Sequence, residues 1–381
     1  MPLIYVVAGE SSGDALGGRL MAALAAARPD LGFAGIGGPE MARHGLASLF
    51  PMRDLALMGV LEVVPRLRQL QRRLRETEAD IARLRPDAVV TIDIPGFALR
   101  LLRAIGPLGI PRAHYVAPQV WAWREKRVRH FPGLWESLLC LLPFEPAFFA
   151  CHGLPATFVG HPVLESGAEH GDAGRFRALH GITAGATVLT VMPGSRHSEV
   201  GRLLPVFGGA VTRLATRIAD LRPVVPVAGP VAAAVTAGTR QWAVPPIVVS
   251  DTSDKLDAFA ASAAALTKSG TSTLELALAR VPMVVAYRAN PMTAAIVRRV
   301  IKVRYASLLN LLPGEEVVPE LLQQDCTPQR LAGVLQDLLT EAGIADAQRA
   351  RFGPVLDTLR PPTGTPSEAA AAAVLRLLDH A

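Results

Sequence analysis

The chain is poor in cysteine, in aromatic residues and in paired histidines, and each shortage excludes a class of protein. Three cysteines in 381 residues include no CxxC pair, so they cannot form a disulfide scaffold and are expected as small core residues in a reducing compartment. The nine histidines contain no HxH or HExxH pattern, so we expect neither a metal site nor a metal cofactor. With 5% aromatic residues and no recognition motif, nucleic acid is not an expected partner.

Long uncharged hydrophobic runs are missing as well, although half of the residues are hydrophobic and the mean hydropathy is +0.30. A transmembrane helix needs about 20 predominantly apolar residues, but the run 55–64 contains Glu62 and the run 138–142 ends at Pro143. The first apolar run reaches Glu10 with no basic segment before it, which does not fit a signal peptide. High hydrophobicity with a net charge of only +6 excludes a disordered chain. We therefore expect a folded cytoplasmic protein.

Short apolar runs alternate with turns and helical patterns along the whole chain. The expected strands are residues 3–8, 87–92, 113–116, 137–141, 187–192, 222–227, 247–250, 263–267 and 283–287. Continuous apolar runs separated by helices are typical of parallel sheets that are buried on both faces. The fold class is therefore α/β, with two Rossmann-like, doubly wound parallel-sheet domains whose strand ends face a central cleft.

A polar stretch rich in small residues follows position 160 and marks the boundary between the two domains. We expect an N-terminal domain over residues 1–165 and a C-terminal domain over 166–360. Residues 361–381 are expected to form a helix that crosses back to the N-terminal domain or reaches a partner chain, which would make a homodimer.

The turn at residues 268–275 follows an expected strand and opens a helix. Ser269, Gly270 and Thr271 would expose backbone N–H groups at the helix N-terminus, which suits a diphosphate. Glu275, one turn later, could accept hydrogen bonds from ribose hydroxyls. The alternative is an ordinary capped helix, with Thr271 or Ser272 as N-cap and Glu275 closing a capping box.

Two other strand-end turns carry charged side chains. Gly194, Ser195 and Arg196 follow the strand 187–192, and the arginine could bring a fixed cation to a phosphate or could be a solvated loop residue. Asp93 ends the strand 87–92. A carboxylate at this edge of a sheet is a candidate general base, and the alternative is a turn cap.

An apolar segment runs into a basic helical pattern between residues 55 and 75. Leucines form one helical stripe there and arginines cover the other faces. Such a segment suits an anionic membrane surface or an amphiphilic ligand, and the alternative is a core-facing helix with a solvated arginine face. The membrane or lipid candidates are Leu57, Met58, Val60, Leu61, Val64, Arg68 and Arg72. A second basic cluster, without acids, covers residues 298–304.

Several motifs, taken in order, resemble one family. They are GESSGD at 9–14, GIGGPEM at 35–41, LMG at 57–59, IDIPGF at 92–97, YVAPQVWAWR at 115–124, LPFE at 142–145, GHP at 160–162, PGSR at 193–196, SGT at 269–271 and LNLL at 309–312. This set is similar to that of the lipid-A-disaccharide synthases, and the resemblance spans about residues 3–335.

The resemblance implies an inverting glycosyltransferase of the GT-B fold. Such an enzyme transfers 2,3-diacylglucosamine from UDP-2,3-diacylglucosamine to the 6-hydroxyl of 2,3-diacylglucosamine 1-phosphate. The products are the β(1→6) disaccharide 1-phosphate of lipid A biosynthesis and UDP. The family works without a metal or cofactor, peripherally at the cytoplasmic face of the inner membrane of Gram-negative bacteria.

The resemblance also implies roles for single residues. Asp93 matches the candidate base, while Arg196 with the turn at 269–271 would stabilise the leaving UDP. Glu275 would bind the ribose, and Asn310 is a further donor-site candidate. The first glycine-rich loop places Glu10, Ser12 and Asp14 at the cleft. Members of the family often carry a second acid where this chain has Gly96, and its absence favours Asp93 as the base.

Two other functions remain open at this point. The first is an enzyme that resembles UDP-N-acetylglucosamine 2-epimerase, with the same fold and a soluble sugar nucleotide as its substrate; such an enzyme has no use for the apolar basic segment. The second is a two-lobed binding protein without activity, which would capture a ligand without releasing UDP.

Overall fold

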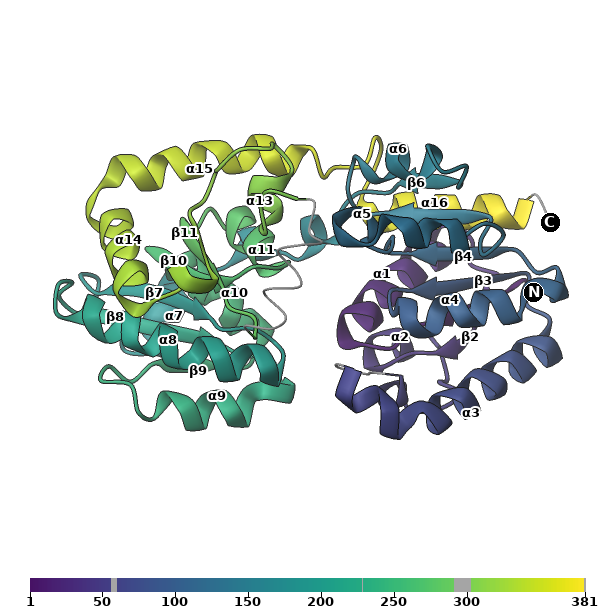
Figure 1. Ribbon diagram of the computed structural model, residues 1–381, viewed down its shortest axis with the longest axis horizontal. Helices are drawn as coiled ribbons and strands as arrows, with labels where there is room; N and C mark the ends of the chain where they lie inside the picture. The colour runs from purple at the N-terminus through teal and green to yellow at the C-terminus, as the bar shows by residue number, and fades with distance from the viewer. Residues whose placement is uncertain (56–59, 228, 291–302, 380–381) are drawn as a thin grey trace. The chain divides into compact units, whose positions relative to one another are not determined.

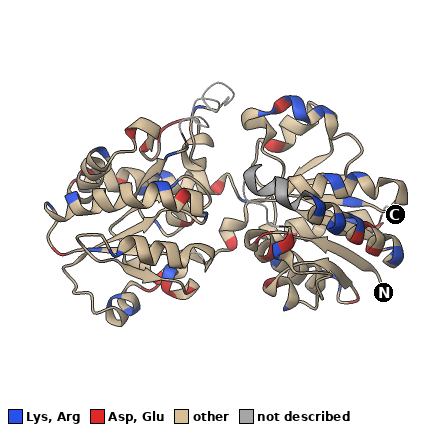
Figure 2. Ribbon diagram, turned by 60° about the horizontal axis from the view of Figure 1, so that its bottom comes forward, with Lys and Arg blue, Asp and Glu red and all other residues tan. Residues whose placement is uncertain are grey.

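The structure, a computed structural model, describes residues 1–55, 60–227, 229–290 and 303–379, and only the backbone of residues 60–67 and 342. The chain forms two compact units (Figure 1). The first combines Met1–Pro162 with Leu359–Ala381, and the second is Val163–Thr358. These boundaries lie within a few residues of the predicted domain limits. Acidic and basic residues both occur on the helices and loops of each unit (Figure 2).

The first unit is built on one six-stranded sheet in which every strand pairing is parallel. In spatial order the strands are β2 (Gly32–Ile36), β1 (Leu3–Val7), β3 (Ala88–Ile92), β4 (Arg112–Tyr115), β5 (Ser137–Cys140) and β6 (Ala156–Phe158). The helices are α1 (Ser11–Ala27), α2 (Pro39–Ala42), α3 (Val60–Leu84), α4 (Pro95–Ala104), α5 (Val120–Trp123), α6 (Glu145–Ala150) and α16 (Pro366–Asp379). Short 3₁₀ turns include η1 (Met52–Asp54), η2 (Gly106–Leu108) and η3 (Glu125–His130).

Alternate residues of each strand face opposite layers of helix. Ile4 and Val6 pack in a cluster with α1 and α16, whereas Tyr5 and Val7 pack with α3 and α4 on the other face. A parallel strand that is covered on both faces needs apolar side chains at every position, which explains the continuous apolar runs of the sequence.

The second unit repeats this architecture with another six-stranded parallel sheet. Its strands, in spatial order, are β12 (Glu320–Leu322), β11 (Met283–Tyr287), β10 (Ala264–Lys268), β7 (Thr187–Met192), β8 (Leu221–Pro226) and β9 (Ile247–Val249). Its helices are α7 (Ala173–Leu179), α8 (His197–Ala215), α9 (Ala232–Thr239), α10 (Thr252–Ala261), α11 (Ser272–Leu278), α13 (Leu308–Leu311), α14 (Pro328–Thr340) and α15 (Ala342–Asp357). The helices α8 and α14 pack on one face of the sheet, and α7 and α10 pack on the other.

In each sheet the order in which the chain adds strands changes direction once. We call the position between the two adjacent strands where this happens the switch point. It lies between β1 and β3 in the first unit and between β7 and β10 in the second. Open parallel sheets bind ligands at this point, outside the carboxyl ends of the strands. Substrate-binding and catalytic residues are therefore expected in the turns after these four strands.

Candidate functional site

The chain turns sharply after β3 at Asp93, in a strained conformation. Asp93 and Ile94 have φ angles of +53° and +41°, and Val116, after the neighbouring β4, has a φ of +78°. Left-handed backbone is strained for β-branched residues, costs about 1–3 kcal/mol per residue, and concentrates at functional sites. The Asp93 N–H donates to the carbonyl of Tyr115 at 2.8 Å, which fixes the half-buried Asp93 at the edge of the sheet.

The turn after β1 packs directly against this strained turn. A Cβ atom on Gly9 would lie 2.7 Å from Cδ1 of Ile94, so only glycine lets the two turns approach. The next residue, Glu10, is half-buried and is the N-cap of α1, and Ser12 is exposed in the first turn of that helix. Because β1 pairs with β3, the structure brings Glu10 and Ser12 to the same sheet edge as Asp93.

Asp14 does not belong to this edge, contrary to the prediction. Its side chain is 3% exposed. Its Oδ1 accepts from the N–H groups of Gly38 (2.8 Å) and Met41 (3.1 Å), and its Oδ2 accepts from that of Glu40 (3.0 Å). These are the orphan donors at the start of α2. Asp14 therefore caps α2 from α1 and holds the two helices together.

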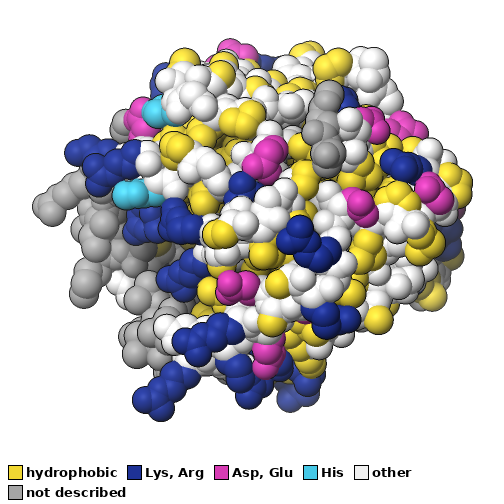
Figure 3. Space-filling view, turned by 90° about the vertical axis from the view of Figure 1, so that its right-hand side faces the viewer, with side chains coloured by type: hydrophobic (Ala, Val, Ile, Leu, Met, Phe, Trp, Pro, Cys, Tyr) yellow, Lys and Arg dark blue, Asp and Glu magenta, His cyan; other side chains and the backbone are white. Residues whose placement is uncertain are grey.

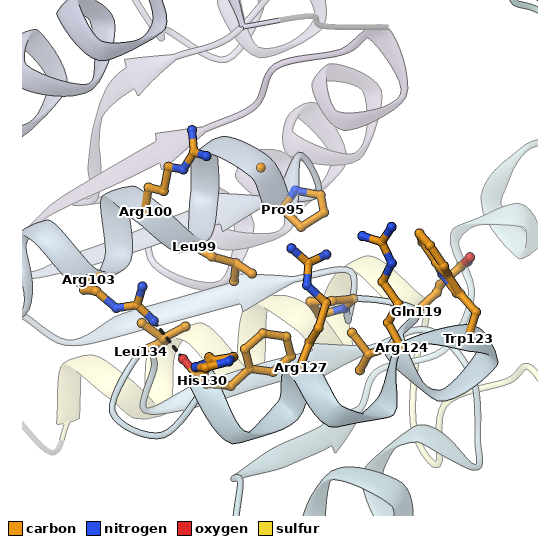
Figure 4. Close-up of a pocket in the computed structure, with 14 residues that line it drawn as sticks. Pro95, Leu99, Arg100, Arg103, Gln119, Trp123, Arg124, Arg127, His130 and Leu134 are labelled. Carbon is orange, nitrogen blue, oxygen red and sulfur yellow. Dashed lines mark hydrogen bonds between the residues drawn. The ribbon is translucent and has the colours of Figure 1, made fainter. Parts of the chain in front are cut away.

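A pocket of about 380 Å³ opens beside the Asp93 turn, between α4 and the segment α5–η3 (Figure 4). Apolar side chains form much of its lining, and the charged residues among the lining are all arginines. The fourteen lining residues are Pro95, Gly96, Leu99, Arg100, Arg103, Pro118, Gln119, Val120, Trp123, Arg124, Arg127, His130, Phe131 and Leu134. The sequence pattern does not predict this pocket, because its arginines come from two segments more than twenty residues apart.

The segment α5 is anchored by a buried carboxylate. Glu145 is 2% exposed and accepts from Trp121 Nε1 at 3.0 Å and from the N–H groups of Leu141 (3.1 Å) and Leu142 (3.0 Å). Burial raises the pKa of Glu145 to about 7 even though these three donors lower it. The tryptophan therefore has a positional role: it ties the wall of the pocket to the loop after β5.

In the second unit, the turn after β7 is organised by Glu199 at the start of α8. Gly194 has a φ of +121°, and a Cβ there would lie 2.5 Å from Oε2 of Glu199. The same carboxylate accepts from the N–H of Ser195 at 3.2 Å and pairs with Lys268 at 3.2 Å and Arg196 at 3.5 Å. Two cations thus share one buried carboxylate, which leaves a net positive charge at the switch point of the sheet.

The neighbouring turn, after β10, contains the predicted diphosphate loop. Gly270 has a φ of +155°, and the Ser269 hydroxyl donates to the carbonyl of Ala306 at 2.7 Å. Thr271 is the N-cap of α11 but makes no side-chain capping bond. Glu275 pairs with Lys255 at 3.0 Å. The alternative of a capping box is therefore wrong, and strand pairing brings this turn beside the one that carries Arg196.

Asn310 is not placed to contact a ligand, contrary to the prediction. It is fully buried. Its Nδ2 donates to the Val318 carbonyl and to Glu320, and its Oδ1 accepts from the N–H groups of Val317 and Val318, all at 2.7–2.9 Å. An amide can make about four such bonds, so the side chain is fully used in fixing the loop before β12.

Sequence reasoning missed Lys268 and Glu199 as site residues. Lys268 ends β10 and Glu199 lies in the first turn of α8, and both are largely buried, with side chains 16% and 9% exposed. Their link spans 69 residues of sequence. The sequence offers one signal that could have identified them. Each lies at the carboxyl end of an expected strand or in the segment that follows it.

The apolar basic segment is described only in part. Leu57 and Met58 lie outside the described residues, as do the side chains of Val60, Leu61 and Val64. Further along α3, Leu70 and Leu74 pack in the core, as the alternative of a core-facing helix predicts. The candidate arginines are exposed; Arg72 pairs with Glu76 at 3.2 Å. Figure 3 shows Lys and Arg side chains gathered toward one edge of the face it presents.

None of the helices in the described ranges combines the length and the hydrophobicity that crossing a bilayer requires. No group of three or more His, Cys, Asp or Glu side chains in those ranges is arranged to hold a metal ion.

Solved structures with the same fold include an epimerase and a glycosyltransferase. The UDP-GlcNAc 2-epimerase of Neisseria meningitidis bound to UDP-GlcNAc aligns with a TM-score of 0.66 at 11% identity and covers 100% of both chains. The calicheamicin glycosyltransferase CalG4 aligns with a TM-score of 0.60 at 16% identity, over 100% of this chain and 98% of that one. The predicted α/β fold of two doubly wound sheets, of the GT-B type, is confirmed.

Curated sequences give a closer relationship. The family profile described as lipid-A-disaccharide synthetase matches residues 4–373. The lipid-A-disaccharide synthase of Gluconobacter oxydans is 57% identical over 99% of this chain and 91% of its own length. That of Granulibacter bethesdensis is 55% identical over 100% of this chain and 99% of its own. The chain therefore belongs to the lipid-A-disaccharide synthase family.

Proposed function

We propose that the protein is an inverting hexosyltransferase that makes the lipid A disaccharide. It would transfer 2,3-diacylglucosamine from UDP-2,3-diacylglucosamine to the 6-hydroxyl of 2,3-diacylglucosamine 1-phosphate, forming the β(1→6) disaccharide 1-phosphate and UDP. Family membership along nearly the whole chain carries this proposal. The carboxyl edges of the two sheets support it. Asp93 lies at the switch point of the first sheet, and Arg196 and Lys268 lie at that of the second.

The first unit would supply the base. An inverting displacement at the anomeric carbon needs a group that takes the proton of the attacking hydroxyl. Asp93 is the candidate, since its strained turn holds the carboxylate at the sheet edge. Glu10 and Ser12 lie at the same edge and would orient the acceptor sugar. As the C–O bond to the sugar forms, the hydroxyl proton moves to the Asp93 carboxylate.

The second unit would stabilise the leaving group. The bond from the anomeric carbon to the diphosphate breaks, and the departing UDP keeps the electron pair and gains negative charge. Arg196 and Lys268 at the β7 and β10 ends, with the N–H groups of the turn at residues 269–271, would balance that charge. Glu275, which pairs with Lys255, would accept hydrogen bonds from the ribose hydroxyls. The proposal requires no metal ion or cofactor, so a chelator should leave turnover unchanged.

We also propose a peripheral position at an anionic membrane surface. The apolar residues between 57 and 64 would enter the headgroup layer, with Arg68 and Arg72 on its surface. Sedimentation with phosphatidylglycerol vesicles tests this, and serine substitutions at Val60, Leu61 and Val64 should release the protein from them. Unchanged sedimentation of that variant would contradict the membrane proposal.

One assay separates this function from its alternative. Purified protein should release UDP only when both acylated substrates are present. An enzyme like the UDP-N-acetylglucosamine 2-epimerases, which share the fold, would instead epimerise UDP-N-acetylglucosamine with no lipid acceptor. Turnover of that soluble nucleotide alone would contradict the proposed transfer.

A further inference from the structure

The pocket beside the Asp93 turn gathers four arginines that are not paired with acids. Arg100 and Arg103 come from α4, and Arg124 and Arg127 from the segment α5–η3. None of the four makes a salt bridge with a carboxylate in the described parts of the chain. By contrast, three other arginines of the chain, Arg73, Arg112 and Arg175, each pair with an acid at 2.5–2.8 Å. Unpaired guanidinium groups around one cavity point to an anionic ligand.

The arginines are partly held in place by neighbouring groups. Nη2 of Arg103 donates to the His130 carbonyl at 2.8 Å, and the guanidinium of Arg124 lies 3.8 Å from the ring centroid of Trp123. In Figure 4 the guanidinium groups of Arg124 and Arg127 point from the segment α5–η3 toward the side of the pocket where Pro95 lies. These contacts reduce the side-chain entropy that anion binding would cost.

Apart from Gln119 and His130, the rest of the lining has no polar side chain except the indole of Trp123, which narrows the class of ligand. Leu99, Val120, Phe131 and Leu134 line the cavity between the arginines, and the last three are buried. A purely ionic ligand would not need these side chains. A cavity with an apolar floor and a cationic rim suits an amphiphile that carries a phosphate or another compact anion.

The position of the pocket links it to the reaction. Pro95 and Gly96, which line it, follow Asp93 by two and three residues on the same turn. In the proposed acceptor, the reacting 6-hydroxyl is carried through C6 on C5 and the phosphate is carried on C1, the two carbons that flank the ring oxygen, so one rigid hexose ring connects them. A phosphate held among the arginines would therefore set the ring so that its hydroxyl end faces the sheet edge.

We propose that this pocket binds the phosphomonoester of the acceptor, with the arginines around the phosphate and the apolar floor against the adjacent acyl chain. This inference rests on the proposed function and assigns a subsite to it. Arg124 and Arg127 contribute most, because their guanidinium groups point toward the same side of the pocket (Figure 4). The same chemistry would also attract the phosphate of a membrane lipid, so the test must separate the two sources.

The decisive experiment measures how tightly the full chain binds each of two probes that differ by one phosphate. These are 2,3-diacylglucosamine 1-phosphate and the same lipid without its phosphate, both below their micelle concentration and without vesicles. The wild-type protein should prefer the phosphorylated probe about tenfold or more, the value of a hydrogen bond to a charged group. The double variant Arg124→Gln/Arg127→Gln should lose that preference. Inorganic phosphate should compete with the phosphorylated probe in the wild type.

Arg129→Gln is the matched control. Arg129 is exposed on the same η3 segment and does not line the pocket, so this variant should keep the preference. A double variant that keeps the full preference while losing sedimentation with phosphatidylglycerol vesicles would overturn the proposal and assign the arginines to lipid headgroups. Circular dichroism checks folding, which should be intact because both substituted arginines are exposed.

The binding readout is independent of the proposed reaction. If the wild type bound the phosphorylated probe through these arginines and still released no UDP with both substrates, the proposed function would fail and the subsite would stand. In an active enzyme the double variant should raise the KM for the acceptor about tenfold and leave the KM for the donor unchanged. A changed donor KM with an unchanged acceptor KM would contradict the assignment.

Discussion

Asp93 and Ile94 hold a backbone conformation that their own side chains disfavour, so the surrounding structure must maintain it. The Tyr115 carbonyl accepts from the Asp93 N–H, and Ile94 packs on the bare backbone of Gly9. This conformation fixes the direction in which the Cα–Cβ bond of Asp93 leaves the backbone, and so the place from which its carboxylate projects. A base that projects from a rigid backbone needs less reorganisation to reach a hydroxyl than one on a mobile loop.

Asp14 is expected to matter for stability. In Asp14→Asn one oxygen is replaced by an N–H₂ group, which would face one of the three backbone N–H donors that the carboxylate now accepts from. The variant should lose about 1–3 kcal/mol in the free energy of unfolding, measured in urea. Ser12→Ala, two residues earlier and exposed, should change it by less than about 0.5 kcal/mol. Equal stabilities would show that the helix cap has no such role.

His114 should make the protein sensitive to acid. It is fully buried; Nδ1 lies 2.8 Å from the Thr91 hydroxyl, and Nε2 has no hydrogen-bond partner in the described part of the chain. Burial lowers its pKa from 6.5 to about 4. Between these values the unfolded chain binds a proton that the folded chain does not, so stability falls as the pH drops from about 6.5 to about 4.

The variant His114→Phe isolates this effect. The ring can still stack on Trp135 but does not titrate. Glu145 acts in the opposite direction, because its pKa is raised to about 7 and its contribution falls as the pH rises from about 4.5 to 7. The difference between the two proteins removes that common contribution. The wild type should lose roughly 3 kcal/mol more than the variant between pH 7 and pH 4, and parallel curves would contradict the account.

At the scale of elements, the turn between β7 and α8 shows how a glycine positions charges. Gly194 allows Glu199 to fold back under the turn, where it holds Lys268 and Arg196. A side chain at this position would meet both a disfavoured φ and the carboxylate itself. The cations that would face the diphosphate therefore depend on one residue without a Cβ.

Gly194→Ala should consequently lower stability by about 1–3 kcal/mol and raise the donor KM. Gly201→Ala, within the same α8, is the matched control: nothing lies near its Cβ position, and alanine should stabilise the helix by about 0.5–1 kcal/mol. Thermal unfolding and donor KM measured on both variants test this. A Gly194→Ala protein with an unchanged donor KM would show that the turn does not bind the donor.

The sequence predicts most strands but not all of them. The expected runs correspond to β1, β3, β4, β5 and β7–β11, because each is a buried apolar run. β2 is not predicted, since its glycines have low strand propensity; Gly35 is needed there because a Cβ would collide with the Val6 carbonyl. β6 and β12 span three residues each and contain a polar residue, Thr157 and Glu320, so neither is a continuous apolar run as the equally short β9 is.

The site residues, like the strands, are predictable only where the pattern of apolar runs reveals their position. Residues whose role comes from strand ends, such as Asp93 and Arg196, are found because sheet topology is readable from the chain. Asp14 and Asn310 are misassigned because a polar loop residue looks the same whether it caps a backbone or binds a ligand. The arginine pocket is missed because it forms only when α4 and the segment α5–η3 pack together.

At the scale of the whole molecule, the chain returns to the first unit after completing the second. The helix α16 packs against α1, with Ala370, Ala371, Ala373 and Val374 buried in the same cluster as Leu20. Small side chains along one face let the two helices lie close together. The last element of the chain therefore completes the core around the first strand.

Val374→Asp should destabilise the first unit and leave the core of the second unit unchanged. Val374 is fully buried, and an unpaired carboxylate there would cost about 3 kcal/mol or more. Ala372→Asp, on the exposed side of the same helix, is the control. Hydrogen exchange should rise in β1 and α1 of the first variant only. Equal protection in both variants would mean that α16 does not support this unit.

The central claim is that Asp93 serves as the base of an inverting transfer between two acylated sugars. Asparagine tolerates the left-handed conformation as well as aspartate does, so Asp93→Asn should keep the turn and the binding of both substrates. The most direct measurement is kcat for UDP release by this variant with both acylated substrates at saturation. We predict a fall of about 100-fold or more, with the KM of each substrate changed by less than about threefold. Turnover near the wild-type value would contradict the claim.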